Sequence, residues 1–375
     1  MPRHWFLLPL CLGLVSCSGP RKEPAQSSGT PFVFQALNLR QQDSQGRLLW
    51  RVSSPEARYD LDRRIAQSRQ LRGEIFANGV PLYRLQASHG IVLGDGEVLQ
   101  LEGDVTVQRL GGDPVVIRAD RMRWYPQQQR LELDRHALAR TPSLELLARQ
   151  ATLWFDRDRL ELRGRPELRQ QDLRLRVQQL NWSPGTGVLV AEGPAVASSG
   201  GAAHNPRTLK AAGLSGNTQT RTLLLAEPVI LTAPAQQAWL RAQASSVDLK
   251  HNTISSPHPF AGGVAQLAIS GDGFRLDLND QTATILRDCR LHRPDAALQA
   301  GRCSWNWTTQ QVIASGGVAV QRSSNQQTTR ARSLNGKLGA QGQLVFSSPG
   351  SRVVSRFRLP KSSPTASPGG PAIRL

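Results

Sequence analysis

Apolar and polar residues alternate in short segments along most of the chain from Phe32 onwards. Gly46 marks a tight turn, after which Leu48, Trp50 and Val52 are apolar at alternate positions. None of the segments sustains the three- and four-residue spacing of an amphipathic helix, and alternation of this kind predicts strands with one buried face. We therefore predict an all-β chain. Its clearest alternating segments are residues 82–93, 97–109, 130–140 and 158–168.

A repeat of 29 to 32 residues underlies the segments in the first half of the chain. Its copies begin at Ala57, Ala87, Ala119, Ala148 and Val177. Fourteen residues later stand Leu71, Leu101, Leu133, Leu162 and Ala191, followed two residues on by Gly73, Gly103, Arg135, Gly164 and Gly193. Three tryptophans are interpreted as one matching position: Trp124, Trp154 and Trp182. The pattern returns at Ala300, Trp305, Ala314 and Gly316, so the sequence predicts stacked β-hairpins rather than an α/β enzyme.

Changes in composition divide the chain into regions. We predict a lipoprotein signal peptide at 1–17, a flexible tether at 18–30, a β-jelly roll at 31–196, a Gly-rich linker at 197–217, a second β-repeat region at 218–359 and a disordered tail at 360–375. The alternation leaves open whether the second region forms a separate roll or continues the first.

The N-terminus resembles a secretory signal, with Arg3 and His4 ahead of an apolar stretch that ends at Val15. Residues 14–17, Leu-Val-Ser-Cys, are typical of a bacterial lipobox, in which the Cys17 thiol accepts the lipid. We therefore expect Cys17 to be a lipid anchor and the mature chain to lie in the cell envelope. The alternative is an ordinary signal peptide with an incidental cysteine.

The chain is strongly basic, with 46 Lys and Arg residues against 28 Asp and Glu, a formal net charge of +18. Such a balance suits nucleic acid, anionic envelope material or a solvated surface. Because the lipobox directs the chain out of the cytoplasm, we expect no nucleic-acid partner.

Two of the 4 cysteines, Cys289 and Cys303, are left once the signal peptide is removed and Cys17 is lipidated. In an oxidising compartment they form a possible disulfide, and the alternative is two buried thiols on separate strands.

The sequence contains no pattern that indicates catalysis. No metal-binding spacing, nucleophile motif or complete phosphate-binding loop is found, so we expect no catalytic residue, metal or cofactor and no enzyme activity. Asp156 and Asp158 are expected to be solvated turn carboxylates. The Gly94–Gly96 and Gly271–Gly273 segments, each Gly-Asp-Gly, are expected to be hairpin turns.

The segment from Phe32 to Gly90 resembles the start of an LptC-family domain. The likeness rests on Gln42, Asp43, Gly46, Trp50, Ala57 and Tyr59, then on the Gly73–Phe76 and Ala87–Gly90 units. It extends to about residue 196, where the repeated units resemble those of LptA-type bridge proteins. Better-known LptC members are shorter and keep an uncleaved membrane helix, so the lipobox is a departure.

The resemblance implies an open, V-shaped β-jelly roll that carries lipopolysaccharide acyl chains in its interior, with one roll or two consecutive rolls in the chain. It implies further partners: an inner-membrane ABC transporter at the edge near Phe32 to Leu39, and an LptA-like bridge protein or outer-membrane assembly protein at the other. We expect the protein on the periplasmic side of the envelope, anchored in the inner membrane in preference to the outer. The alternative function is a structural or polysaccharide-binding envelope lipoprotein.

Candidate residues for the lipid groove are inward-facing apolar positions of the first half, for which the alternative is a closed core. They are Trp50, Val52, Leu85, Leu101, Val105, Val107, Ile117, Trp124, Leu131 and Leu133.

Overall fold

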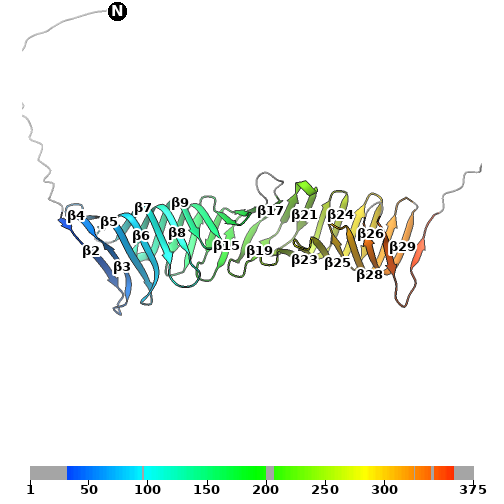
Figure 1. The fold of residues 1–375 in the computed structure, drawn as a ribbon, viewed down its shortest axis with the longest axis horizontal. Helices are drawn as coiled ribbons and strands as arrows, with labels where there is room; N and C mark the ends of the chain where they lie inside the picture. The colour runs from blue at the N-terminus through cyan, green and yellow to red at the C-terminus, as the bar shows by residue number, and fades with distance from the viewer. Residues whose placement is uncertain (1–31, 95–96, 200–206, 325, 339–341, 359–375) are drawn as a thin grey trace, which may run out of the picture.

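Two ladders of antiparallel strands face each other along the whole length of an elongated molecule (Figure 1). The computed structural model describes residues 32–94, 97–199, 207–324, 326–338 and 342–358. Strand order follows the chain from one end of the body to the other, with β1 and β2 at one end and β30 and β31 at the opposite end. The predicted all-β fold class is confirmed.

Eleven long strands contribute one half to each ladder, while the shorter strands belong to one ladder only. The long strands are β5 (Ile65–Ala77), β6 (Val80–Leu93), β7 (Val98–Arg109), β8 (Val116–Tyr125), β9 (Arg130–Arg140), β10 (Glu145–Trp154), β23 (Thr253–Val264), β24 (Leu267–Asp277), β25 (Thr282–Arg293), β28 (Gln311–Arg322) and β29 (Gln327–Lys337).

Ladder A is completed by β2 (Leu37–Gln42), β3 (Leu48–Ser54), β12 (Glu167–Gln170), β13 (Leu173–Arg176), β16 (Ala195–Ser199), β17 (Arg207–Ala211), β20 (Val229–Ala233), β21 (Ala238–Ala242), β26 (Ala296–Ala300) and β31 (Val354–Arg356). Ladder B is completed by β1 (Phe32–Phe34), β4 (Glu56–Asp60), β11 (Arg159–Arg163), β14 (Gln179–Trp182), β15 (Val188–Glu192), β18 (Gly213–Asn217), β19 (Thr222–Ala226), β22 (Ser245–Asp248), β27 (Arg302–Asn306) and β30 (Leu344–Ser347). Two short 3-10 turns, η2 (Pro126–Gln128) and η3 (Pro234–Gln236), lie in hairpin loops.

A long strand bends where it passes from one ladder to the other, and its pairing shifts register there. In β7 the bend is at Gly103 and Asp104, whose φ angles are 73° and 49°. The left-handed region suits glycine, because an ordinary residue there brings its Cβ close to its own backbone. The matching bend of β9 uses Arg135 and His136, at 61° and 51°. The glycine position of the sequence repeat is therefore a bend between ladders, and Arg135 adopts the same backbone conformation.

The bends lie along one side of the molecule and the hairpin loops along the other, because each long strand has its bend in the middle and its loops at the ends. We call the bent side the spine, and the side where loops of ladder A face loops of ladder B the mouth. The space between the ladders is reached through the mouth.

Apolar side chains point into the space between the ladders. Alternate residues of each strand point inward, as in β3, where Trp50 and Val52 are buried and Arg51 is exposed. The Trp50 ring from ladder A meets the Trp124 ring from ladder B edge to face, with centroids 5.1 Å apart. A second cluster, which contains Trp305, fills the C-terminal end.

Three sequence expectations are wrong. Residues 207–217 of the predicted linker form β17 and β18, which extend both ladders without a break, and residues 200–206 lie outside the described part. The Gly271–Gly273 segment lies inside β24, at its bend, and is not a hairpin turn. Trp154 is one residue out of step with the repeat: it faces outward under Arg130 and Arg157, and Leu153 takes the buried position.

Cys289 and Cys303 are joined as a disulfide, with Cα atoms 5.9 Å apart. The two residues lie on β25 and β27 near the bend of β25. The bond therefore joins these two strands at the spine, toward the C-terminal end of the molecule. The predicted signal peptide, Cys17, the tether and the tail lie outside the described residues. No helix among the described residues has the length and apolar character needed to cross a membrane.

Candidate functional site: a central apolar groove

All ten residues predicted to line a groove lie in the interior between the ladders, with exposed fractions of 7 % or less. They pack against one another in a single cluster with residues from both ladders. None of them lines the cavities found between the ladders. In this conformation the first half of the molecule therefore has a closed core, which was the alternative for these positions.

A clasp of polar and aromatic side chains closes the mouth over this core. Tyr83 and its cross-strand neighbour Arg109 belong to ladder A, whereas Phe155 and Asp158 belong to a loop of ladder B. The Tyr83 hydroxyl donates to Asp158 Oδ1 at 3.3 Å, and its ring lies 5.1 Å from that of Phe155. Asp158 is thus half-buried and bonded to the opposite ladder, and is not the solvated carboxylate that was predicted.

Asp158 also ties neighbouring loops of ladder B together. Its Oδ2 accepts hydrogen bonds from the Ser183 hydroxyl at 2.8 Å and the Gly185 amide at 2.6 Å. Burial raises the pKa of the Tyr83 phenol, and the negative charge of Asp158 raises it further, against the opposing effect of Arg109. The phenol therefore stays protonated and keeps its hydrogen-bond donor.

Beyond the clasp the ladders part, and an open apolar groove lies between them. Its widest part is a cavity of about 410 Å³ beneath strands of both ladders. Leu209 and Leu231 reach it from ladder A, and Leu223 and Val247 reach it from ladder B, all four half-buried. No hydrogen bond crosses the mouth between the ladders among described residues 207–307.

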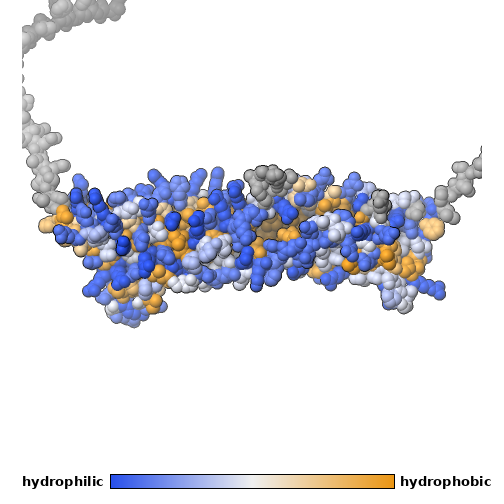
Figure 2. All heavy atoms as spheres, viewed as in Figure 1, coloured by the Kyte–Doolittle hydropathy of each residue, from blue (hydrophilic) through white to orange (hydrophobic). Residues whose placement is uncertain are grey.

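A second cavity of about 210 Å³ continues the groove toward the C-terminus, past Phe260, Phe274 and Trp305. Arg207, Leu231 and Leu278 line both cavities, so the two are parts of one space, here called the central groove. Figure 2 shows hydrophobic residues gathered at the middle of the molecule, beside the strands labelled β17 and β21 in Figure 1.

The ladder B rim of the central groove is built from four consecutive loops of one design. Each begins with an Asn or Asp whose side chain accepts backbone amides two and three residues later, an Asx turn. The four are Asn217, Asp248, Asp277 and Asn306. Each loop ends in a left-handed residue: Arg221, Asn252, Gln281 or Gln310.

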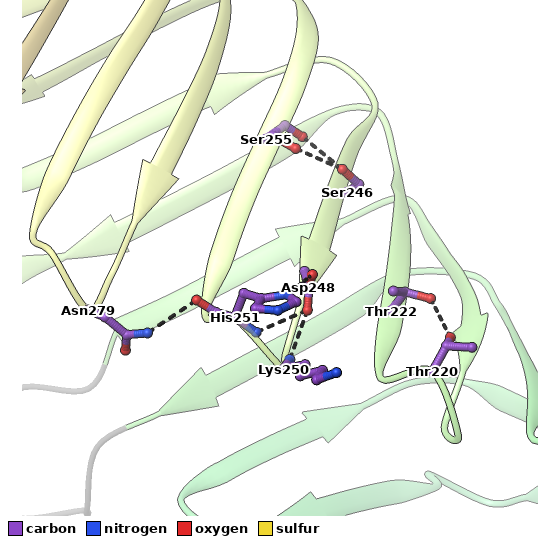
Figure 3. A network of polar contacts seen from close by, with 8 residues as sticks. All are labelled: Thr220, Thr222, Ser246, Asp248, Lys250, His251, Ser255 and Asn279. Atoms are coloured by element: carbon purple, nitrogen blue, oxygen red, sulfur yellow. Dashed lines mark hydrogen bonds and ion pairs between the residues drawn. The ribbon is translucent and has the colours of Figure 1, made fainter.

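The second residue of each of these loops points toward the groove: Thr218, Leu249, Leu278 and Trp307. Its amide donates to the carbonyl of the left-handed residue one loop earlier, as Leu249 does to Arg221 at 2.9 Å. Figure 3 shows the Asp248 loop, where Asp248 bonds Lys250 and His251, and the Asn279 amide reaches the His251 carbonyl at 3.2 Å. Stacked loops of this design hold three apolar second residues, Leu249, Leu278 and Trp307, in a row along the mouth.

The rim of the widest part carries charged side chains, which are Arg207 and Asp172 from ladder A and Arg221 and Asp248 from ladder B. Both Asp248 oxygens are used within its own loop, and hydrogen bonds from the His251 ring and amide lower the pKa of its carboxyl. The site is thus an apolar slot with a polar edge. No group of three or more His, Cys, Asp or Glu side chains is placed to hold a metal ion in the part of the chain that the structure describes.

A larger hollow, of about 800 Å³, lies on the outer face of ladder A near the N-terminal end. Arg51 and Arg84 line it and contact Glu74 at 2.5 and 3.6 Å. Most of the side chains that line it are polar or charged.

Sequence reasoning missed the central groove because alternation reports which face is inward, and not how far apart two ladders stand. A usable signal was nevertheless present. An Asn or Asp followed four residues later by Arg, Asn or Gln recurs every 29 to 31 residues from Asn217 to Asn306. That recurrence marks the loops of the rim.

Comparison with protein-family models agrees with the resemblance found in the sequence. Residues 11–165 match a family model described as "Lipopolysaccharide-assembly, LptC-related". No match was found among curated proteins. Among solved structures, LptH from Pseudomonas aeruginosa, described as the LptA homologous periplasmic component of the lipopolysaccharide transport device, aligns at 15 % identity and a TM-score of 0.26, covering 31 % of this chain and 82 % of LptH. Over residues 11–165, this chain is therefore similar to the LptC-related lipopolysaccharide-assembly family.

Proposed function

We propose that this protein is a membrane-anchored periplasmic component of the lipopolysaccharide export machinery, and not an enzyme. It holds the acyl chains of the glycolipid in the central groove and passes them from the inner-membrane ABC transporter to the next bridge protein. The observation that carries the proposal is the open apolar slot between two ladders, in a chain whose first part is LptC-related.

The physical argument is one of solvation. Acyl chains leave water favourably for an apolar surface, at about 25 cal/mol per Å² removed from water. Half-buried leucines such as Leu209, Leu223 and Leu231 provide such a surface, which is reached through the mouth. The polar groups of the glycolipid remain at the wet rim. A closed core offers no such space, so the ten residues of the first half take part in transfer only if the clasp opens.

Both ends of the molecule suit pairing with neighbours. Among the described residues, β1 pairs only with β4, and β30 and β31 pair only with β29. Phe32, Val33 and Phe34 of β1 are 45 to 59 % exposed, and Val345 of β30 is 65 % exposed. Open edges of this kind can continue into a strand of another protein through main-chain hydrogen bonds. We propose that the β1 and β2 edge faces the transporter and the C-terminal edge faces an LptA-like bridge or outer-membrane assembly protein.

Site-specific photo-crosslinking in living cells tests the groove. A photo-reactive residue at Leu223 or Leu231 should crosslink to lipopolysaccharide. Leu224 is the matched control, because it is the adjacent leucine on β19, 60 % exposed on the outer face. Labelling should require ATP hydrolysis by the transporter, since the glycolipid reaches the groove only after it leaves the membrane.

Equal labelling at Leu223 and Leu224, or labelling that is indifferent to ATP, contradicts the conduit and favours a structural envelope lipoprotein. Val107 and Trp124 report on the closed half. Labelling there at the level of Leu223 would show that the clasp opens during transport.

A further inference from the structure

Two arginines line the widest part of the central groove, one from each ladder. Arg207 lies on β17 in ladder A, on the same face of the strand as Leu209 and the buried Ala211. Arg221 lies in the β18–β19 loop of ladder B. Both line the cavity of about 410 Å³, so a molecule in the groove has a guanidinium at either rim.

Neither side chain has an ion pair or a hydrogen bond with another of the described residues, whereas some arginines on the outer face, among them Arg51, Arg163 and Arg176, contact a glutamate. The Nε of Arg221 is buried and has no hydrogen-bond acceptor among the described residues. A buried donor without an acceptor loses its water and gains nothing in return, which destabilises the folded protein. An anionic oxygen in the groove would remove that cost.

The turn itself does not require an arginine at residue 221. Asn252, Gln281 and Gln310 occupy the same left-handed position in the next three loops, with φ between 52° and 61° against 60° for Arg221. The loop therefore forms without a positive charge at this position, and the guanidinium of Arg221 is explained by its place in the groove.

The rim is not positive overall, because Asp172 and Asp248 also line the cavity. Asp248 is hydrogen-bonded within its own loop, and neither carboxylate forms an ion pair with Arg207 or Arg221 among the described contacts. An anion would therefore be held by direct hydrogen bonds from the two guanidinium groups and not by a long-range field.

From this geometry we infer that Arg207 and Arg221 bind the anionic headgroup of the amphiphile whose chain lies in the central groove. The inference rests on the proposed function of the groove and adds its selectivity. The site discriminates between amphiphiles by headgroup charge, and phosphate suits it because an arginine fork can donate two parallel hydrogen bonds to its oxygens.

The test is calorimetric titration of the purified mature protein with decyl phosphate and decyl maltoside, below their micelle-forming concentrations, and with inorganic phosphate. The two amphiphiles share a chain and differ in headgroup charge. Decyl phosphate should bind about tenfold more tightly than decyl maltoside, as one charge-assisted hydrogen bond predicts. Inorganic phosphate should bind far more weakly than either.

Arg221→Gln is the matched variant, because glutamine already occupies this loop position at Gln281 and Gln310. In Arg221→Gln and Arg207→Gln the preference for the phosphate headgroup should fall to near one, with maltoside affinity unchanged. Arg290→Gln, at an exposed site on β25, should keep the preference.

Equal binding of both amphiphiles to the wild type overturns the inference and leaves the proposed function standing. Absence of binding by both overturns the two together. Loss of maltoside binding in Arg221→Gln shows that the arginine shapes the groove, and tight binding of inorganic phosphate shows an ion site independent of the chain. Either result overturns selection by headgroup.

Discussion

At the scale of single residues, Asp158 joins the two ladders through side-chain contacts at the mouth. Its carboxylate accepts hydrogen bonds from Tyr83 on β6 and from Ser183 and Gly185 in the β14–β15 loop. If this half-buried carboxylate loses its partners, or if its removal leaves them unsatisfied, the free energy of unfolding falls by more than the net value of one hydrogen bond. The clasp is therefore a local source of stability for the closed half.

Replacing Tyr83 by phenylalanine removes one hydrogen bond of the clasp and keeps the ring against Phe155. We expect the free energy of unfolding to fall by about 1 kcal/mol, and by about 2 to 3 kcal/mol in Asp158→Ala, which leaves several donors unpaired. Urea denaturation measures both. Tyr125→Phe is the control, because the Tyr125 hydroxyl bonds Glu132 on the outer face and its loss should cost only a few tenths. Equal losses in Tyr83→Phe and Tyr125→Phe would show that the clasp adds nothing.

Glu167 on β12 provides a pH-dependent contribution. Burial would raise the pKa of its carboxyl, but hydrogen bonds from Arg169 and Arg176 outweigh burial and lower it below the ordinary value of 4.5. A lowered folded-state pKa means that the unfolded chain binds the proton first as the pH falls. The contribution of Glu167 is therefore complete above about pH 5 and is lost through acid pH.

We accordingly expect Glu167→Gln to be less stable than the wild type at pH 7, with the difference shrinking between pH 5 and pH 3. Urea midpoints at a series of pH values measure this slope. Glu192→Gln, at an exposed site without an ion pair among the described residues, should keep the slope of the wild type. A parallel curve for Glu167→Gln would contradict the assignment.

The sequence predicts which side chains point inward, because a strand places alternate side chains on opposite faces. The ten candidate positions of the first half were chosen by that rule, and all ten are buried. The same rule could not predict whether these side chains line an open slot or a closed core. That depends on the separation of the ladders, which the clasp fixes through contacts between residues as distant in sequence as Tyr83 and Asp158.

At the scale of elements, the bends and loops explain the repeat. Within one unit of 29 to 32 residues the chain crosses from one ladder to the other and back again. The bends of the unit lie at the spine and its loops lie at the mouth. The sequence revealed the unit but not the place of each part, because Gly271–Gly273 has the composition of a turn and is a bend inside β24. Trp154 shows a further limit: a one-residue shift moves a side chain to the opposite face.

The disulfide belongs to this scale, since it links β25 to β27 close to a bend. We expect the Cys289→Ser, Cys303→Ser double variant to lose about 3 kcal/mol of unfolding free energy, the value for a closed loop of this length. Thiol trapping of protein taken from the envelope should find both cysteines blocked until a reductant is added. A reductant that leaves the wild-type urea midpoint unchanged would show that the bond does not stabilise this end.

At the scale of the whole molecule, the two ladders continue through the region predicted to separate two rolls. Small and polar residues around 197–217 resemble a linker in composition, yet main-chain hydrogen bonds in a ladder do not depend on side-chain type. β17 and β18 pair on both sides for that reason. Composition alone therefore could not reveal that the second region continues the first.

Anchoring is a property of the whole chain. If Cys17 carries the lipid, Cys17→Ser should leave an unprocessed precursor and abolish labelling with radioactive palmitate. The matched control is Cys11→Ser, which changes a cysteine inside the same signal segment and should leave processing and labelling intact. Normal processing and labelling of Cys17→Ser would remove the lipid anchor from the proposal.

Because the ladders are unbroken, the length of the molecule can change while its fold stays the same. Neighbouring strands in a ladder are about 4.8 Å apart, so about twenty strand positions give a body of roughly 100 Å. One more repeat adds two strands to each ladder and about 10 Å of reach. Because each strand bonds only to its neighbours, units can be gained or lost without rebuilding the rest. The number of repeats thus sets the distance that the protein spans.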